Sequence, residues 1–269
     1  MTNTQTLTAV PEIAPTEGLA GKLLAGRHSL PLTIALHLVP GLLIVAAYFL
    51  IGEPLVQAIG YPIFLAWAVA LAVVLVPVLA GLLWLGRVRN GRFSLAGVVA
   101  YRDRPIPRGR IIALIAGLIV WMTVVSLALT PLDNVVFDTF FTWLPFEGAG
   151  GSATTYLDGY PHSLLVTTML ISLPVTGFAL PLIEELYFRG FLLPRIAHLG
   201  LAAPVLNTVL FAVYHFWAPW TVLSKVIFMF PAVWLVWRKH DLRISIGMHP
   251  GTALLMATVG TLALLFGVV

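Results

Sequence analysis

Long runs of hydrophobic residues separated by short polar segments dominate this sequence. Most runs reach or approach the ~20 residues with which a helix crosses ~30 Å of hydrocarbon. The alternation of polar and hydrophobic residues that is typical of a half-buried strand is not seen, and a helix satisfies its own backbone amides inside a bilayer. The pattern therefore predicts an all-α fold, a polytopic transmembrane helical bundle of about seven spans (six to eight). The predicted spans are residues 32–51, 62–86, 111–130, 164–183, 201–217, 222–237 and 244–269.

The composition supports this class and excludes several others. Hydrophobic residues make up 59% of the chain and charged residues only 10%, whereas about 25% of a typical soluble chain is charged. A soluble fold with so little charge would expose large hydrophobic patches to water. The chain has no cysteine, which excludes a disulfide scaffold, a Cys-ligated metal and a thiol nucleophile.

The first residues differ from the rest of the chain. They are rich in Thr, Pro and Glu and lack the basic region and short hydrophobic run of a signal peptide. We expect a flexible cytoplasmic tail over residues 1–30, followed by one transmembrane domain over residues 31–269. Residues 131–163 are predicted to form a long external loop, for which we infer no chemistry.

The loops differ in charge, and this difference predicts their orientation. The segment 87–110 carries seven arginines and one aspartate. The loops expected on the opposite side contain no Lys or Arg; their acidic residues are Glu53, Asp133, Asp138, Glu147 and Asp158. By the positive-inside rule we expect the arginine-rich loop and the N-terminus to be cytoplasmic. We expect the membrane to be the cell membrane of a bacterium. The net charge of +4 is thereby explained by topology and contact with anionic lipids. We expect the lipid bilayer as a partner and no nucleic acid.

Ionisable side chains inside a membrane span are costly, and each one is a hypothesis about function. Four places stand out: His37, the cluster of Glu184, Glu185 and Arg189, His215, and His249. A lone histidine in a hydrophobic segment is more often structural than a ligand, and His37 is interpreted in that way.

The glutamate pair divides into two roles on a helix. Glu185 and Arg189 are four residues apart and share a face, so they can form an ion pair. Glu184 is turned by about 100° from Glu185, which leaves it facing the interior of the bundle. The alternative is that both glutamates belong to a solvated cluster at the cytoplasmic end of the helix.

Depth in the membrane favours a meeting of Glu184 with His215 and His249. If one helix continues from Glu184 to Arg195 at the cytoplasmic face, Glu184 lies about 16 Å deep, and His215 reaches a similar depth. One carboxylate and two imidazoles are a ligand set typical of zinc. The metal would lower the pKa of a bound water, and a carboxylate would accept its proton. The sequence has neither the HExxH motif of zincins nor a GxSxG elbow.

These residues resemble the CPBP intramembrane metalloproteases, which include CAAX prenyl endopeptidases of the Rce1 type and bacteriocin-processing (Abi) homologues. The EExxxR motif of that family, commonly followed by glycine, is met by Glu184 to Gly190. The FxxxH motif is met by Phe211 and His215 one helix later. The third motif, HxxxN, begins at His249 but has Ala253 at its last position, with Thr252 and Thr258 as nearby polar side chains. The resemblance covers about residues 164–257.

The resemblance implies a metal-dependent endopeptidase that cleaves a membrane-associated protein or peptide, lipidated or not. It implies that Glu184 activates water, that His215 and His249 bind Zn²⁺ or the oxyanion, and that Glu185 and Arg189 support them. Ala253 favours a second hypothesis, a homologue with impaired catalysis that acts as a membrane immunity or scaffold protein. A third hypothesis is an ion- or proton-coupled transporter, which also has buried ionisable residues but is expected to show inverted repeats.

Overall fold

The computed structural model describes residues 18–101, 106–145 and 159–268. These residues form helices and no strand longer than an isolated bridge. The first part of the chain contains α1 (Leu19–Leu24), α2 (Leu30–Ala47), the π-helical η1 (Tyr48–Gly52), α3 (Glu53–Ala58), α4 (Phe64–Asn90) and α5 (Arg108–Phe140). The second part contains α6 (His162–Pro174), η3 (Val175–Ala179), α7 (Leu180–Glu184), η4 (Glu185–Leu192), α8 (Leu193–Arg195), η5 (Ala197–Leu199), α9 (Ala202–Tyr214), η6 (Pro219–Thr221), α10 (Val222–Lys239) and α11 (Arg243–Leu265).

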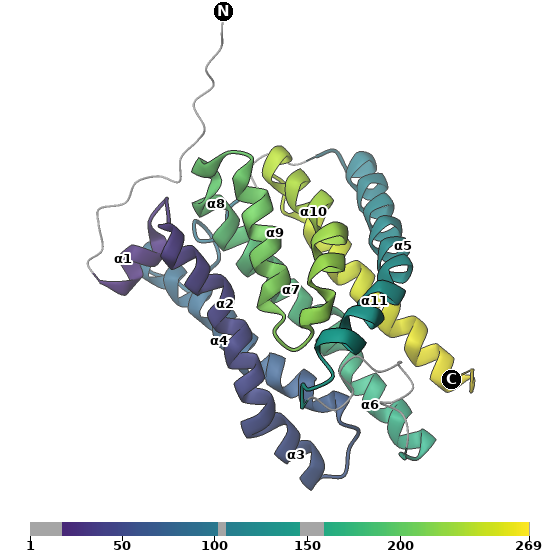
Figure 1. The fold of residues 1–269 in the computed structure, drawn as a ribbon. Coiled ribbons are helices and arrows are strands. Elements are labelled where there is room, and N and C mark those ends of the chain that lie inside the picture. The colour runs from purple at the N-terminus through teal and green to yellow at the C-terminus, as the bar shows by residue number, and fades with distance from the viewer. Residues whose placement is uncertain (1–17, 102–105, 146–158, 269) are drawn as a thin grey trace, which may run out of the picture.

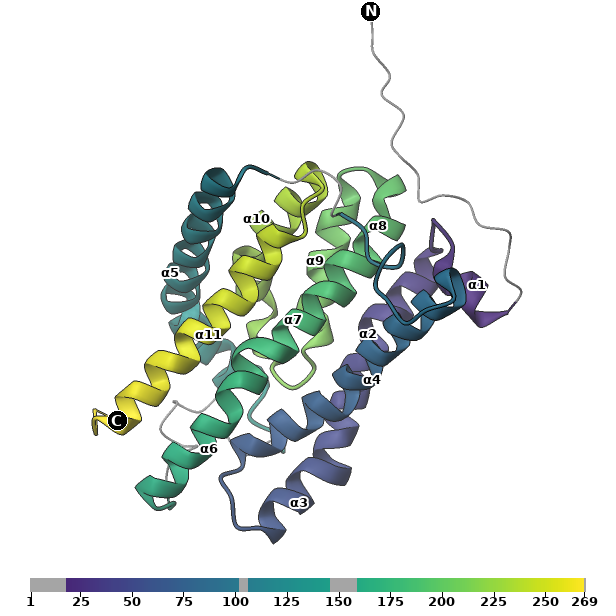
Figure 2. The same ribbon diagram turned by 180° about the vertical axis from the view of Figure 1, so that it is seen from behind.

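The helices lie alongside one another in one bundle. Figures 1 and 2 show α2 and α4 on one side, α5, α10 and α11 on the other, and α7 and α9 between them. Six helical segments are long and apolar enough to cross a membrane, and the shorter apolar α9 adds a seventh element. The predicted class, a polytopic helical bundle of about seven spans, is confirmed, and the chain is an integral membrane protein. Its orientation remains a prediction.

Two loop predictions differ from the structure. α5 runs on through Pro131 to Phe140, so the described beginning of the expected loop 131–163 is helical; residues 146–158 lie outside the described residues. Of the expected tail 1–30, residues 1–17 also lie outside them. Residues Leu19–Leu24 form α1, and His28 is buried. The polar composition of the tail does not indicate this packing, because it depends on a distant residue, Arg195. The amide of His28 donates to the carbonyl of Arg195, and the side chain of Arg195 donates to the carbonyl of Leu23.

The segment His162–Arg195 carries the glutamate pair through the centre of the bundle. It is continuously helical, but η3 and η4 are π-helical turns within it. η3 directly follows Pro174, and a proline cannot donate the backbone hydrogen bond that an α-helix requires. π-helical turns occur frequently at functional sites, and here η4 begins at Glu185.

The core beside this segment is aromatic. Phe188 and Phe211 are almost completely buried, and their rings meet edge to face with centroids 5.0 Å apart. The buried ring of Tyr214 lies 4.9 Å from Phe188. These three rings join η4 to α9, so the helices that carry the first two motifs are packed directly on one another.

Candidate active site

Glu185 and Arg189 form a fully buried ion pair. Oε1 of Glu185 lies 3.2 Å from a terminal nitrogen of Arg189, and both side chains are 0% exposed. The guanidinium also lies over the ring of Phe211, 3.8 Å from its centroid. Nδ1 of His249 lies 2.8 Å from the same Oε1 of Glu185. The pairing predicted from the spacing is present, and Glu185 additionally connects η4 to α11.

Glu184 is buried in the bundle and forms no ion pair with Arg189. The hydroxyl of Tyr214 donates a hydrogen bond of 2.9 Å to Oε1 of Glu184. Its other oxygen, Oε2, lies 3.9 Å from Nε2 of His249. Only 7% of the side chain is exposed, so the carboxylate is not part of a solvated cluster. The contact between Glu184 and His249 is the one expected from the sequence; Tyr214 was not expected there.

His215 lies directly after the last residue of α9 and is buried. Its Nδ1 lies 2.8 Å from the carbonyl oxygen of Phe211 and donates to it. The ring of Phe211 meets both imidazoles edge to face, with centroids 4.8 Å from His215 and 5.8 Å from His249. Phe211, the first residue of the second motif, thus brings the two histidines to the same neighbourhood.

The two imidazoles are held in the same way, which leaves the same ring nitrogen, Nε2, for a ligand. Each uses Nδ1 for a hydrogen bond to the protein, His215 to a carbonyl and His249 to Glu185. Histidines that bind metal through Nε2 are usually held in this way. However, the described residues contain no group of three or more His, Asp or Glu side chains arranged to hold a metal ion. The side chains therefore do not fit a three-ligand zinc site as they stand, and we derive no catalytic step through zinc.

The third motif ends at Ala253, and the polar side chains next to it are those of Thr252 and Thr258. Thr252 is buried, and its hydroxyl has no hydrogen-bond partner among the described residues. The hydroxyl of Thr258 donates to the carbonyl of Leu254 in its own helix. Of the two threonines considered from the sequence, only Thr252 keeps its hydroxyl available.

His37 supports the motif helix from the other side. Its Nδ1 donates to the carbonyl of Thr33, and its Nε2 accepts a hydrogen bond of 3.0 Å from the side chain of Asn207. Asn207 also donates to the carbonyl of Phe188 in η4. A π-helical turn shifts backbone hydrogen bonds out of the α-helical register, and Asn207 satisfies one carbonyl there. His37 has the structural role that was expected.

Sequence reasoning missed three polar residues near the motifs: Tyr214, Asn207 and Lys225. Lys225 is an ionisable residue inside a predicted span, and the rule that such residues mark functional sites would have identified it. Tyr214 precedes the motif histidine, but nothing in a single sequence shows that its hydroxyl reaches Glu184. The contacts of Asn207 likewise depend on how the helices pack.

Close packing fixes the helices around the site. A Cβ on Gly190, the glycine after Arg189, would lie 2.5 Å from a methyl group of Val99. The backbone amide of Ala100 donates to the carbonyl of Gly190, so the loop after α4 lies directly on η4. A Cβ on Gly41 in α2 would overlap the carbonyl oxygen of Tyr214. Both glycines permit close approach of backbones that position the site.

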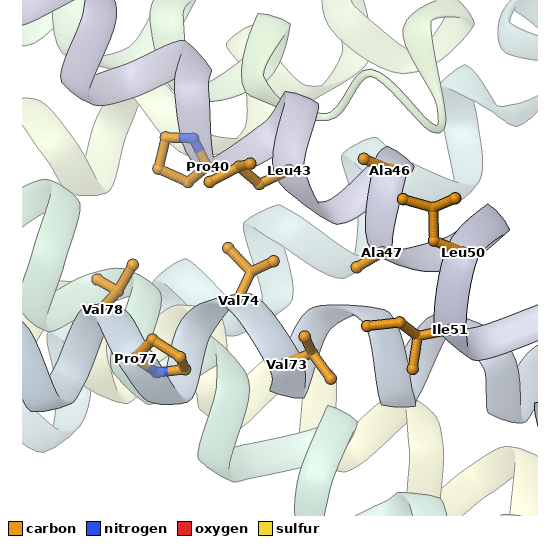
Figure 3. Close-up of a pocket in the computed structure, with 10 residues that line it drawn as sticks. All are labelled: Pro40, Leu43, Ala46, Ala47, Leu50, Ile51, Val73, Val74, Pro77 and Val78. Atoms are coloured by element: carbon orange, nitrogen blue, oxygen red, sulfur yellow. The ribbon is translucent and has the colours of Figure 1, made fainter.

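A cavity of about 530 Å³ lies between α2 and α4, away from the motif residues (Figure 3). Its walls are aliphatic side chains and two prolines, Pro40 of α2 and Pro77 of α4. None of the lining side chains titrates or binds a metal, so we assign the cavity no part in the chemistry.

Comparison with known proteins supports the family that the motifs indicated. Residues 166–255 match the family model described as Type II CAAX prenyl endopeptidase Rce1-like. A search of curated proteins found no match. No solved structure matched either. The match spans all three motifs, and the family resemblance is therefore confirmed for the segment that carries them.

Proposed function

We propose that this protein, whose residues 166–255 are Rce1-like, is an intramembrane endopeptidase in which Glu184 activates the attacking water. One observation carries the proposal: the buried carboxylate of Glu184 is held between Tyr214 and His249, which come from two other helices. A general base must be fixed within reach of the water that it deprotonates. Residues from two other helices fix Glu184 in this way.

The two carboxylates have different partners, and they have different roles in the proposed reaction. Glu184 takes a proton from water, and the resulting hydroxide attacks the carbonyl carbon of the scissile peptide bond. Glu184 then gives the proton to the leaving nitrogen as the C–N bond breaks, which yields a carboxylic acid and an amine. Glu185 is engaged by Arg189 and His249 and so orients His249 beside Glu184 without entering the reaction.

A cleavage assay tests this function. The matched family, Type II CAAX prenyl endopeptidase Rce1-like, suggests the probe: a prenylated peptide that ends in a CAAX sequence, with an unprenylated copy for comparison. Protein in lipid vesicles is incubated with each peptide, and the released fragment is detected by mass spectrometry. We expect Glu184→Gln to slow cleavage about 100- to 10,000-fold, the range typical of a general base.

The matched control is Glu53→Gln, which makes the same exchange in α3 outside the motifs, and it should cleave at the normal rate. Cleavage by Glu184→Gln at the normal rate would rule out Glu184 as the base. Cleavage of the prenylated peptide alone would indicate that the lipid is part of the recognised substrate.

Zinc is tested separately, as the metal-assisted form of the proposal. Since the described side chains do not form a three-ligand site, His215 and His249 would hold the ion only together with water or substrate, and the ion would make the bound water more acidic. About one zinc per chain, lost in His215→Ala together with activity, would support that form. Full activity in the presence of a strong chelator would contradict it and leave Glu184 as the sole activating group.

Ala253 supports a second candidate, a non-catalytic immunity or scaffold protein. It replaces the polar residue that ends the third family motif. Restoring that residue with Ala253→Asn separates the candidates. An impaired enzyme is expected to cleave faster with the asparagine, whereas a scaffold is expected to cleave neither peptide with or without it.

A further inference from the structure

Lys225 is a cation in the first turn of α10, inside the candidate span Pro219–Lys239. Its ammonium group donates a hydrogen bond to the hydroxyl of Thr221. No carboxylate lies within ion-pair distance of it among the described residues. A lysine at membrane depth is costly and usually marks a pathway or a binding site. This lysine therefore requires a reason other than a structural ion pair.

A chain of hydrogen bonds connects Lys225 to His215. The amide of Ala218 donates to the carbonyl of His215, and the hydroxyl of Thr221 donates to the carbonyl of Ala218. The ammonium of Lys225 in turn donates to that hydroxyl. The tight connection between α9 and α10 thus holds the ammonium at the end of α9 where His215 lies.

The surroundings of the ammonium are electrostatically mixed. It interacts across space with Asp133 of α5 and with Glu184. It also interacts across space with His215. Asp133 is engaged by Ser224, whose hydroxyl donates to it over 2.8 Å. The positive charge therefore acts on Glu184 and His215, but it forms a direct ion pair with neither Asp133 nor Glu184.

We propose that Lys225 binds an anionic oxygen of the substrate beside Glu184 and His215. The inference rests on the proposed endopeptidase function and adds a group that the family motifs do not contain. In a site with little water, a fixed positive charge stabilises a negative oxygen far more than it would in solution. The polar side chain that ends the third motif is absent here, and Lys225 in α10 adds a positive charge that comes from outside the motifs.

Two sources of that oxygen are chemically alike. One is the oxyanion that forms when water attacks the peptide carbonyl, while Glu184 holds the proton from the water. The other is the carboxylate at the C-terminus of a peptide substrate. Two copies of the probe peptide distinguish them, one with a free C-terminal carboxylate and one with a C-terminal amide.

The experiment compares kcat and KM of the full-length protein and of Lys225→Met in lipid vesicles on both peptides. If Lys225 stabilises the oxyanion, kcat falls about 100- to 1,000-fold on both peptides. If it binds the terminal carboxylate, kcat/KM falls at least tenfold on the free-acid peptide and is unchanged on the amide. Normal kinetics of Lys225→Met on both peptides would overturn the proposal.

Matched variants separate charge from folding. Lys225→Gln keeps a donor for Thr221 but removes the charge, so it gives the same test if the methionine variant is unstable. Lys225→Arg is expected to retain most of the rate. Lys239→Met removes an exposed lysine from the other end of α10 and should cleave normally.

Glu184→Gln, assayed alongside, distinguishes this proposal from the function on which it rests. If the wild type cleaves and Glu184→Gln does not, the function stands whatever Lys225 does, and normal kinetics of the Lys225 variants refute the anion site alone. If the wild type cleaves neither peptide, both proposals are contradicted.

Discussion

Two buried arginines, six residues apart on one helical segment, have opposite kinds of partners. Arg189 pairs with the carboxylate of Glu185 and lies over Phe211. Arg195 has no ion pair among the described residues; it donates to the carbonyls of Leu23, Val98 and Phe191 and lies over the ring of Phe191.

The difference indicates that Arg189 belongs to the candidate active site and that Arg195 belongs to the packing of the bundle. Arg195 joins three segments, the end of α1, the loop after α4 and η4, by donating hydrogen bonds to one backbone carbonyl in each. The guanidinium of Arg189 makes no hydrogen bond of good geometry within the part of the chain that the structure describes, and its contribution is positive charge beside Glu185. We infer that Arg195 stabilises the fold and that Arg189 balances the negative charge of Glu185 in the site.

The largest expected effect comes from removing the charge of Arg189. Arg189→Met leaves Glu185 buried without its cation, which typically costs about 3–5 kcal/mol, and it also disturbs His249. We expect a large loss of unfolding free energy, measured in mixed detergent and SDS, together with loss of cleavage. The double variant Arg189→Met/Glu185→Gln should recover part of the stability, because no buried charge is then unpaired.

Arg195→Met gives the contrasting result. It removes hydrogen bonds to three carbonyls, worth roughly 0.5–1.5 kcal/mol each, and leaves the site residues in place. Stability should fall, while cleavage per folded molecule stays near normal. Loss of cleavage in folded Arg195→Met would show that the division between the two arginines is wrong.

A smaller effect is expected at Gly190, which lies between the two arginines. Gly190→Ala brings a Cβ to 2.5 Å from Val99 and 3.0 Å from Leu242, and overpacking of this kind costs about 1–3 kcal/mol. The same exchange at Gly260 in α11, where nothing lies within 4 Å, should not destabilise the protein. Adding Val99→Ala to Gly190→Ala should restore stability if the clash is the cause.

Sequence periodicity predicted what depends on local geometry. The spacing of four residues predicted the pair of Glu185 and Arg189, and their turn relative to Glu184 predicted that Glu184 faces inward. The hydrophobic runs predicted the helical bundle. Each of these follows from a single helix and the membrane around it.

The features that the sequence did not predict depend on contacts between distant segments. The π-helical turn at Glu185 is accompanied by a side-chain donor from Asn207, which a helix considered alone does not have. α9 ends before His215 because the chain turns there, with the amide of Phe216 donating to the carbonyl of Tyr214. The neighbours of Lys225 come from α5 and α7, and no local pattern connects them.

A comparison of two tyrosines tests whether Tyr214 belongs to the site, and a smaller effect is expected here. Tyr214 donates its hydroxyl to Glu184, and Tyr187 donates its hydroxyl to the carbonyl of Leu36. Exchange of either for phenylalanine removes one buried hydrogen bond, so each should cost about 1 kcal/mol of stability. Only Tyr214→Phe should slow cleavage, by about tenfold, which corresponds to ~1.4 kcal/mol. Equal cleavage by the two variants would remove Tyr214 from the site.

The smallest expected effect concerns pH at the Arg195 end of the segment. Burial, together with the positive charge of Arg195, lowers the pKa of His28 from 6.5 to about 4, although a hydrogen bond to the carbonyl of Leu23 opposes the shift. Since the unfolded chain binds a proton on His28 more readily than the folded one, His28 destabilises the fold as pH falls from about 6.5 to about 4. The difference between unfolding midpoints at pH 7.5 and pH 5 should therefore be smaller in His28→Gln than in the wild type.

Arg195→Met should also reduce this difference, since the cation that opposes protonation of His28 is gone, whereas Arg189→Met should not. An equal pH dependence in the wild type and His28→Gln would mean that His28 is protonated in the fold, and the Arg195 end would then carry two adjacent positive charges instead of one.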